Sequence, residues 1–205
     1  MILSFDTATD VATACVSAQG EVLAESATAG RSVGAQHLLA DVHVLFDRAG
    51  IAVEDVEMIV AGTGPGTFTG LRIGLATARA LGFALGVPVR GVSTLAALLH
   101  PAGVDVACID ARRGEVFCAG AGIEPQAMTP LQLVAALPTA AVVAGDGAVR
   151  YRDVLAGAAI PPDDSPLHVP HARSHAAMAD VAGPPEPCYL RAPDAARNLA
   201  ARAAG

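Results

Sequence analysis

Short apolar runs separated by turn residues dominate the first hundred positions of the chain. Residues 1–5, 11–18 and 21–28 have the length and composition of strands, joined by Asp-Thr and Gln-Gly turns. Residues 36–49 instead carry apolar side chains at helical spacing, and the stripe ends at Gly50. The pattern further predicts a strand near 57–61, a long helix over 73–85, a strand over 87–92 and a short helix over 95–99 capped by Ser93.

The same kind of pattern restarts after residues 101–103. Residues 104–110 and 115–122 predict a hairpin, and Thr129 is expected to cap a helix that has Pro130 at its first position. The last elements predicted are a strand over 140–144, a helix over 148–155 and a short helix capped by Ser174. Because strand, aspartate and turn recur in both halves, we expect an eroded duplication. Its two lobes would cover residues 1–100 and, with a Pro-rich tail, 104–205.

One segment between a predicted strand and the long helix is the most informative of the sequence. This glycine turn reads Gly64-Pro65-Gly66-Thr67-Phe68-Thr69-Gly70-Leu71-Arg72. Glycine tolerates positive φ and proline fixes φ, so the segment predicts a tight turn, with Thr67 or Thr69 capping the helix through its hydroxyl. Phe68 places a large apolar side chain at the loop tip. Arg72 places a cation where it opposes the helix dipole and therefore needs another partner or purpose.

Small residues recur along the helix that follows the turn. Gly70 and Gly74 are four residues apart, Gly82 and Gly86 repeat the spacing, and alanines fill the positions between them. Interior glycine costs a helix roughly 1 kcal/mol relative to alanine, so close approach of another backbone is expected in return. The pattern fits packing on the chain's own sheet and packing on a helix of another molecule equally well.

Composition and charge exclude several classes of site. The chain has 205 residues and a net charge of −7, and all of its 13 basic residues are arginine. The absence of lysine excludes a P-loop lysine, a Schiff-base lysine and a lysine general base. Neither half is basic and no basic cluster stands out in the sequence, so we do not expect the chain to hold nucleic acid alone.

The cysteines and the N-terminal residues indicate an intracellular protein. The four cysteines lie far apart without a Cys-x-x-Cys pair, and the predicted hairpin places Cys108 opposite Cys118. We expect reduced thiols in a cytoplasmic protein. The N-terminus has no basic region, and Asp6 and Asp10 interrupt what could have been the apolar core of a signal peptide.

The glycine turn resembles the signature of the bacterial TsaB (YeaZ-like) family, the partner subunit in making threonylcarbamoyladenosine on tRNA. Weaker similarities follow in the family's order along the chain. They are the opening Ile-Leu-Ser-Phe-Asp-Thr-Ala-Thr, Gln-His-Leu-Leu at 36–39, Gly-Val-Ser-Thr-Leu at 91–95, Asp-Ala-Arg-Arg-Gly-Glu-Val-Phe at 110–117 and Pro-Cys-Tyr-Leu-Arg at 187–191.

This resemblance implies an α/β fold of the duplicated ribonuclease-H-like type found in the actin, Hsp70 and sugar-kinase superfamily, in reduced form. It also implies a scaffold that binds a catalytic TsaD-type subunit, with a TsaE-type ATPase, for threonylcarbamoyl transfer to the adenosine 3′ of the anticodon. The chain could pair with itself when alone, and would meet tRNA only through the complex. The expected partner interface comprises Gln36, His37, Leu38, Val42, Leu45, Phe46, Thr67, Phe68, Thr69, Gly70, Leu71, Arg72, Gly74, Ala78 and Gly82.

The alternative is an active enzyme of the same superfamily, either a nucleotide-dependent transferase or a metallopeptidase. Remnant nucleotide loops would involve Asp6, Thr7, Asp110, Gly145 and Gly147. However, Ala8 replaces the glycine expected after Asp6, and Asp146 would place a carboxylate beside a nucleobase. We therefore expect Asp6 and Asp110 to be strand-end residues that accept backbone N–H bonds, and we expect no cofactor.

Three histidines cluster near the end of the chain, and two of them have a metal-pair spacing. His171 and His175 would lie one helical turn apart, with His168 close by. The related catalytic subunits carry such a pair in the first lobe, where this chain has only His100. We expect a solvated polar loop at 168–175 and no metal site.

Overall fold

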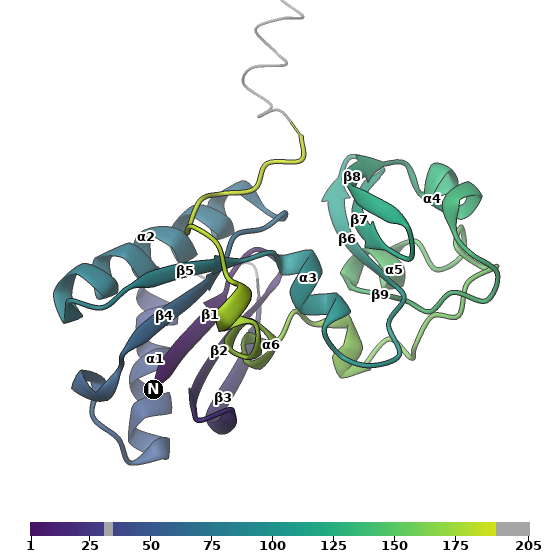
Figure 1. Ribbon diagram of the computed structural model, residues 1–205. Helices are drawn as coiled ribbons and strands as arrows, with labels where there is room; N and C mark the ends of the chain where they lie inside the picture. Colours follow the sequence, from purple (N-terminus) through teal and green to yellow (C-terminus); the bar gives the residue numbers. More distant parts are fainter. Residues whose placement is uncertain (31–34, 192–205) are drawn as a thin grey trace, which may run out of the picture.

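The first part of the chain forms a mixed five-stranded sheet in the computed structural model (Figure 1). The structure describes residues 1–30 and 35–191, without the side chains of residues 35 and 36. The strands are β1 (Ile2–Asp6), β2 (Val11–Ala18), β3 (Glu21–Ala29), β4 (Met58–Gly62) and β5 (Val89–Val92). Their order is β3-β2-β1-β4-β5, with β1 antiparallel to β2 and parallel to β4.

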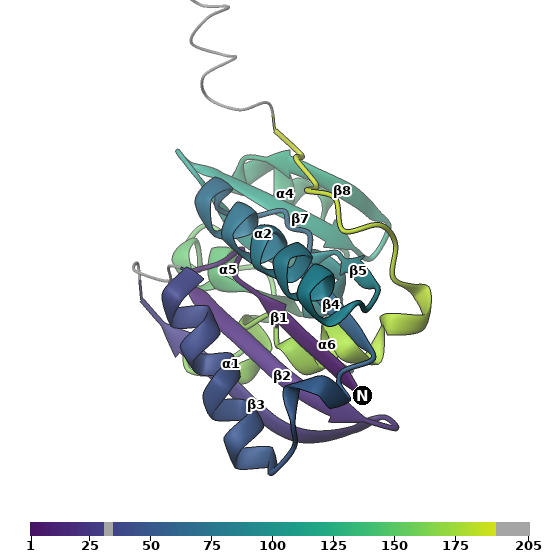
Figure 2. The same ribbon diagram turned by 90° about the vertical axis from the view of Figure 1, so that its left-hand side faces the viewer.

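Helices cover both faces of this first sheet. α1 (Ala35–Ala49) and α2 (Phe68–Leu85) lie on one face (Figure 2), whereas α6 (Ala172–Ala177) lies on the other. Alternation along β1 explains the two faces, because successive side chains of a strand point in opposite directions. Leu3 and Phe5 enter the core with α1 and α2, whereas the Ser4 hydroxyl donates to the Ala172 carbonyl of α6 at 2.8 Å.

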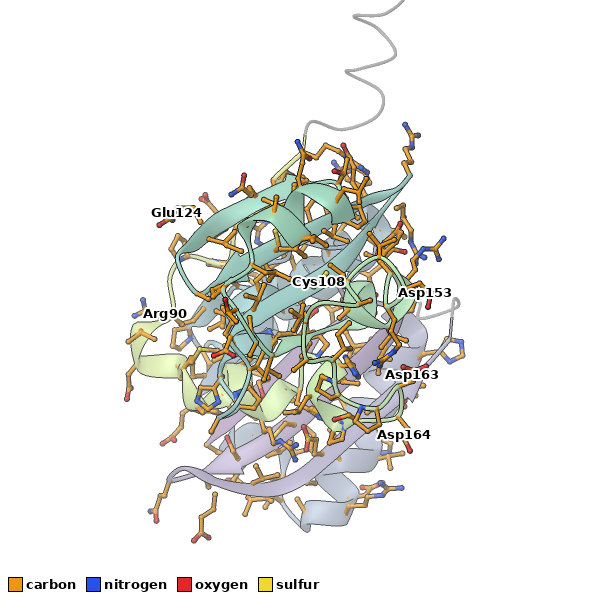
Figure 3. The ribbon with its side chains drawn as sticks, turned by 90° about the vertical axis from the view of Figure 1, so that its right-hand side faces the viewer. Arg90, Cys108, Glu124, Asp153, Asp163 and Asp164 are labelled. Atoms are coloured by element: carbon orange, nitrogen blue, oxygen red, sulfur yellow. The ribbon has the colours of Figure 1, made fainter. Side chains whose placement is uncertain are left out.

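A second, four-stranded sheet follows α3 (Thr94–Leu99), which packs against it and joins the two lobes. Its elements are β6 (Val106–Arg112), β7 (Glu115–Gly120), β8 (Ile123–Met128), β9 (Val143–Ala144), α4 (Pro130–Ala136) and α5 (Asp146–Arg150). The strand order is β8-β7-β6-β9. Cys108 lies opposite Cys118 as predicted, and both are buried free thiols. Figure 3 shows Cys108 in the interior of this lobe, with Glu124 and Asp163 at its periphery.

The end of the described chain returns to the first sheet. After the short 3₁₀ helix Pro166–His168, α6 packs on β1 and β2, and a second 3₁₀ helix spans Ala179–Val181. Gly183 then pairs with Gly91 of β5. The last described residue, Arg191, binds Glu115 of the second lobe at 2.7 Å. The division at 1–100 and 104–205 stays a prediction. The second half contributes the helix α6 to the first lobe.

The architecture confirms the predicted fold class, a reduced and duplicated ribonuclease-H-like fold with two lobes. Two local predictions are wrong and one strand was missed. α5 ends at Arg150 rather than near 155, α6 is preceded by His171 while Ser174 lies inside it, and β8 was not predicted. Within residues 1–30 and 35–191, no helix combines the length and the apolar character that crossing a membrane requires.

Candidate functional site

The glycine turn packs tightly against the loop that follows β1. The Thr67 N–H donates to the Ala8 carbonyl at 2.7 Å, and the Thr7 hydroxyl donates to the Gly70 carbonyl at 2.7 Å. A Cβ on Gly66 or Gly70 would collide with this loop, so only glycine permits the approach. Thr67 stands at the N-cap of α2, but its hydroxyl makes no capping bond, and a cap through Thr67 is therefore wrong.

The small residues of α2 face the chain's own sheet. The buried residues of this helix include Leu71, Gly74, Ala78 and Gly82. A Cβ on Gly74 would collide with Thr7, and a Cβ on Gly82 would collide with Val89 of β5. Of the two interpretations that the sequence left open, packing on the own sheet accounts for these glycines.

The apolar stripe of α1 is also turned inward. Its residues Leu38, Val42, Leu45 and Phe46 form the core of the first lobe together with Leu3 and Phe5 of β1. These four side chains are therefore covered in the free chain. His37 is exposed at the start of the helix, and the side chain of Gln36 lies outside the described residues.

The opposite sides of α1 and α2 expose apolar residues on one face of the molecule. Phe83 is 92% exposed, an unusual value for phenylalanine. Because α1 and α2 touch each other on the same side of the sheet, their outward residues share this face (Figure 2). We call it the outer helix face and define it by Leu39, Val44, Ala76, Ala80 and Phe83.

The first turn of α2 carries an exposed aromatic and cationic group. The Arg72 guanidinium lies 3.7 Å from the centroid of the Phe68 ring. Tyr189 lies beside them, with its ring centroid 5.8 Å from that of Phe68 and its hydroxyl 3.5 Å from Arg72 Nε. Arg72 thus finds a π-system and a phenol as partners, which answers why a cation stands at this end of the helix.

Two cavities lie between the lobes and share Thr67, Arg112 and Arg113 in their walls. One holds about 380 Å³ and is bounded by apolar and aromatic side chains, including Phe68, Phe117 and Tyr189. The other holds about 510 Å³ and is bounded by threonines of the first lobe and arginines of the second: Thr7, Thr9, Thr67, Thr69, Arg112, Arg113 and Arg150. Folding thus brings together arginines that appear scattered in the sequence.

Carboxylates already bind two of these arginines. Arg112 contacts both carboxylate oxygens of Asp10 at 2.8 Å and Asp110 at 3.0 Å, and Arg150 lies 3.4 Å from Asp110. Asp146 accepts the Asp110 N–H at 2.9 Å. Burial raises the pKa of Asp146 to about 6, and the negative charges of Asp110 and Asp10 contribute. The carboxylates of Asp10 and Asp110 thus offset part of the positive charge that the arginines bring to the second cavity.

Asp6 and Asp110 make the backbone bonds that the sequence predicted, but β6 continues past Asp110 to Arg112, so only Asp6 ends its strand. Asp6 accepts the Ala8 N–H at 2.6 Å, and Asp110 accepts the Arg112 N–H at 2.9 Å. Asp6 is completely buried beside His175, away from both cavities. Burial alone would raise the pKa of Asp6, but His175, the Ala8 N–H and the Thr94 hydroxyl together hold it below its usual value.

Gly145 and Gly147 support the fold of the second lobe. A Cβ on either would collide with the backbone of β6, and the space beside them is occupied by the Asp146 carboxylate that binds the Asp110 N–H. The two glycines thus allow the start of α5 to approach β6 closely.

The three histidines bind three different parts of the fold. His168 Nδ1 accepts the Gly145 N–H at 3.1 Å, His171 Nδ1 lies 3.1 Å from Glu25, and His175 Nε2 lies 2.9 Å from Asp6. The predicted solvated loop is wrong, because His168 and His175 are buried. In the part of the chain that the structure describes, no three His, Cys, Asp or Glu side chains gather in a metal-binding arrangement.

Sequence reasoning missed Phe83 and Tyr189. The helical phase of α2 contains the signal for Phe83, which falls three and seven residues after Ala80 and Ala76, opposite the buried positions. Tyr189 contacts Phe68 although more than a hundred residues separate them in the sequence, so no local pattern predicts that contact.

Comparisons with known proteins match this chain along its length. Residues 33–129 match the family model of TsaD, tRNA N6-adenosine threonylcarbamoyltransferase. An uncharacterized protein of Mycobacterium tuberculosis is 35% identical over 202 residues, covering 95% of this chain and 93% of the relative. The tRNA threonylcarbamoyladenosine biosynthesis protein TsaB of Escherichia coli is 36% identical over 124 residues, which are 58% of this chain and 53% of that protein.

A solved structure agrees over nearly the whole fold. It is the crystal structure of a Pseudomonas aeruginosa protein described as similar to peptidase YEAZ. The TM-score is 0.76 at 29% identity, and the match covers 93% of this chain and 99% of that one. The likeness therefore includes both lobes.

Proposed function

Because the chain belongs to the TsaB (YeaZ-like) family, we propose that it is the non-catalytic partner subunit in tRNA threonylcarbamoyladenosine biosynthesis. It docks onto a TsaD-type catalytic subunit, and a TsaE-type ATPase completes the assembly in the cytoplasm. The observation that carries this proposal is the outer helix face, where Phe83 is 92% exposed while the opposite side of the same helix is buried. An exposed aromatic on an apolar face is typical of an interface anchor.

The outer helix face replaces part of the interface that the sequence suggested. Leu38, Leu45, Gly74 and Gly82 hold the helices on their own sheet. They shape the interface from beneath, while the side chains on the opposite sides of α1 and α2 make the contact. Thr69, Phe68 and Arg72 remain in the proposed interface because they are exposed at the start of α2.

The residues in and near the two cavities between the lobes support the proposed non-catalytic role. Asp6 has no exposure to the cavities, and Ala8 fills the position where a phosphate loop needs glycine. Asp10 and Asp110 bind Arg112, and Asp110 also contacts Arg150. A ligand that binds Arg112 or Arg150 in these cavities would have to compete with the internal ion pairs.

Co-purification from the native host tests the proposal. The tagged chain should bring a TsaD-type subunit with it, and Phe83→Asp should weaken that binding at least a hundredfold by placing a charge at the centre of an apolar contact. Leu131→Asp on α4 is the matched control, because Leu131 is 72% exposed in the second lobe. Equal binding by the two variants, or the absence of a TsaD-type partner, would contradict the proposal.

When no partner is present, the outer helix face can pair with a second copy of the chain. We expect the TsaD-type partner to be built on the same duplicated lobe. An apolar face that binds such a lobe can therefore also bind a second copy of this chain. Phe83→Asp should then shift the isolated protein toward monomer in sedimentation velocity, whereas Leu131→Asp should leave the distribution unchanged.

A further inference from the structure

The C-terminal segment, residues 171–191, contacts the glycine turn directly at one point and through buried residues at another. At the sheet edge, the Cys188 N–H donates to the Thr63 carbonyl at 2.8 Å, and Tyr189 lies against Phe68. On the face of the sheet opposite α1 and α2, α6 packs on β1 (Figure 1). Its His175 contacts Asp6 at the end of β1. The segment therefore reaches the turn both directly and through the core.

The contact through the core is a buried polar cluster. His175 and Asp6 are both completely buried, and His175 Nε2 lies 2.9 Å from Asp6 Oδ2. The Thr94 hydroxyl donates to the same carboxylate oxygen at 2.7 Å. His175 Nδ1 lies 3.2 Å from the His171 carbonyl, so an oxygen atom lies close to each of its two ring nitrogens.

Thr94 connects this cluster to the glycine turn. Its hydroxyl accepts the Gly64 N–H at 3.1 Å, and its own N–H donates to the Gly64 carbonyl at 2.8 Å. Both backbone polar groups of Gly64 thus bind one residue. In a water-free interior, each member of such a chain depends on the others, because an unpaired buried carboxylate or N–H is costly.

We propose that Asp6, Thr94 and His175 are positioning residues that fix the glycine turn for partner binding. His175 of α6 lies against the Asp6 carboxylate, and the Thr94 hydroxyl binds that carboxylate. The same hydroxyl binds Gly64, four residues before α2 begins, and so links α6 to the glycine turn. The inference rests on the function proposed above, since the turn orients the first residues of the docking helix. It also explains why a strand-end carboxylate is buried on the face of the sheet away from α1 and α2.

A threonine that anchors the chain just before this segment provides the control. Thr13 is as buried as Thr94, and its hydroxyl donates to the Pro170 carbonyl at 2.9 Å, one residue before the C-terminal segment begins. Thr13→Val and Thr94→Val therefore remove one hydroxyl each from buried sites. Only Thr94→Val breaks the connection between Asp6 and Gly64, and Thr94→Ser keeps it.

The test measures affinity for the TsaD-type subunit with these three variants and with Asp6→Asn, using titration calorimetry on folded protein. Thr94→Val should weaken binding at least tenfold, whereas Thr94→Ser and Thr13→Val should stay within threefold of the unsubstituted chain. Asp6→Asn should behave like Thr94→Val. If Thr94→Val binds as tightly as Thr13→Val, the positioning role is wrong.

A second measurement does not need the partner and separates this inference from the proposed function. Amide hydrogen exchange in the free chain should be at least tenfold faster at residues 67–72 in Thr94→Val than in Thr13→Val, with α1 unchanged between them. This result would support the positioning role even if no TsaD-type subunit binds. Equal exchange at 67–72 would overturn it.

Discussion

The two lobes share a topology but differ in what they build on it. In both, an aspartate at or near the end of a central strand accepts an N–H two residues on, as seen at Asp6 and Asp110. In both, a parallel neighbour leads through glycines into a helix, as β4 leads to α2 and β9 to α5. The fifth strand of the first lobe, β5, is reduced in the second to a single bridge between Val142 and Ala159.

The helices differ far more than the strands. α1 and α2 have 15 and 18 residues, whereas α4 and α5 have 7 and 5. At about 1.5 Å per residue, only the first pair is long enough to offer an extended surface. The second lobe has been reduced around its sheet core, and the first has kept the helices. This asymmetry is why we place the partner surface on the first lobe.

Alanine at Gly62 and at Gly145, the glycines at or directly after the end of the parallel strand that leads to a helix in each lobe, tests whether the lobes are built alike. A Cβ on Gly62 would enter the Asp6 carboxylate, and one on Gly145, at φ +121°, would enter the Cys108 carbonyl. We expect Gly62→Ala and Gly145→Ala each to cost about 3 kcal/mol or more in unfolding free energy by urea denaturation. Gly157→Ala is the control, because open space surrounds Gly157. A tolerated Gly145→Ala would show that the turns are not equivalent.

The sequence predicted the strands of both lobes better than it predicted the site. Alternation along β1 and the stripe of α1 are local signals, and both elements formed within a residue or two of the prediction. β8 was missed because Pro125 stands inside it, and proline is accepted there only because β8 is an edge strand.

The candidate site was harder to predict because its defining contacts are not local. The apolar stripe of α1 was assigned to the interface, whereas burial of Leu45 and its neighbours shows that periodicity marks the core side. The buried contact of Asp6 with His175 joins residues that lie far apart in the sequence. No pattern within either segment specifies the other member.

Aspartates of the two lobes should respond oppositely to pH. The pKa of Asp146 is raised from 3.8 to about 6, so the stability linked to it is lost as pH rises from about 4 to 6. The pKa of Asp6 is lowered, so its contribution is lost only as pH falls below its usual value. Asp146→Asn should therefore gain on the order of 2–3 kcal/mol relative to the unsubstituted chain between pH 4 and pH 7.5.

Chemical denaturation at the two pH values measures this gain. Asparagine keeps an oxygen for the Asp110 N–H, so the comparison isolates the charge. A difference in unfolding free energy between the two proteins that does not change with pH would contradict a buried Asp146 carboxylate with a raised pKa.

The ion pair across the lobes should have the smallest effect. Arg112 and Asp10 contact each other at 2.8 Å, but both side chains are more than a third exposed. We expect a coupling energy of at most about 1 kcal/mol from a double-mutant cycle, falling at 1 M salt. The pair of Arg152 with Asp163, within the second lobe, serves as the reference. A much larger, salt-resistant coupling would mean that this contact holds the lobes together.

Hydrogen exchange with and without the TsaD-type subunit shows which helices the partner covers. Binding should slow exchange in the glycine turn, α2 and the exposed side of α1. β8, α4 and α5 should exchange at the same rate in the free and bound chain. Protection confined to the second lobe, or spread evenly over both, would contradict the assignment of partner binding to the helices that only the first lobe has kept.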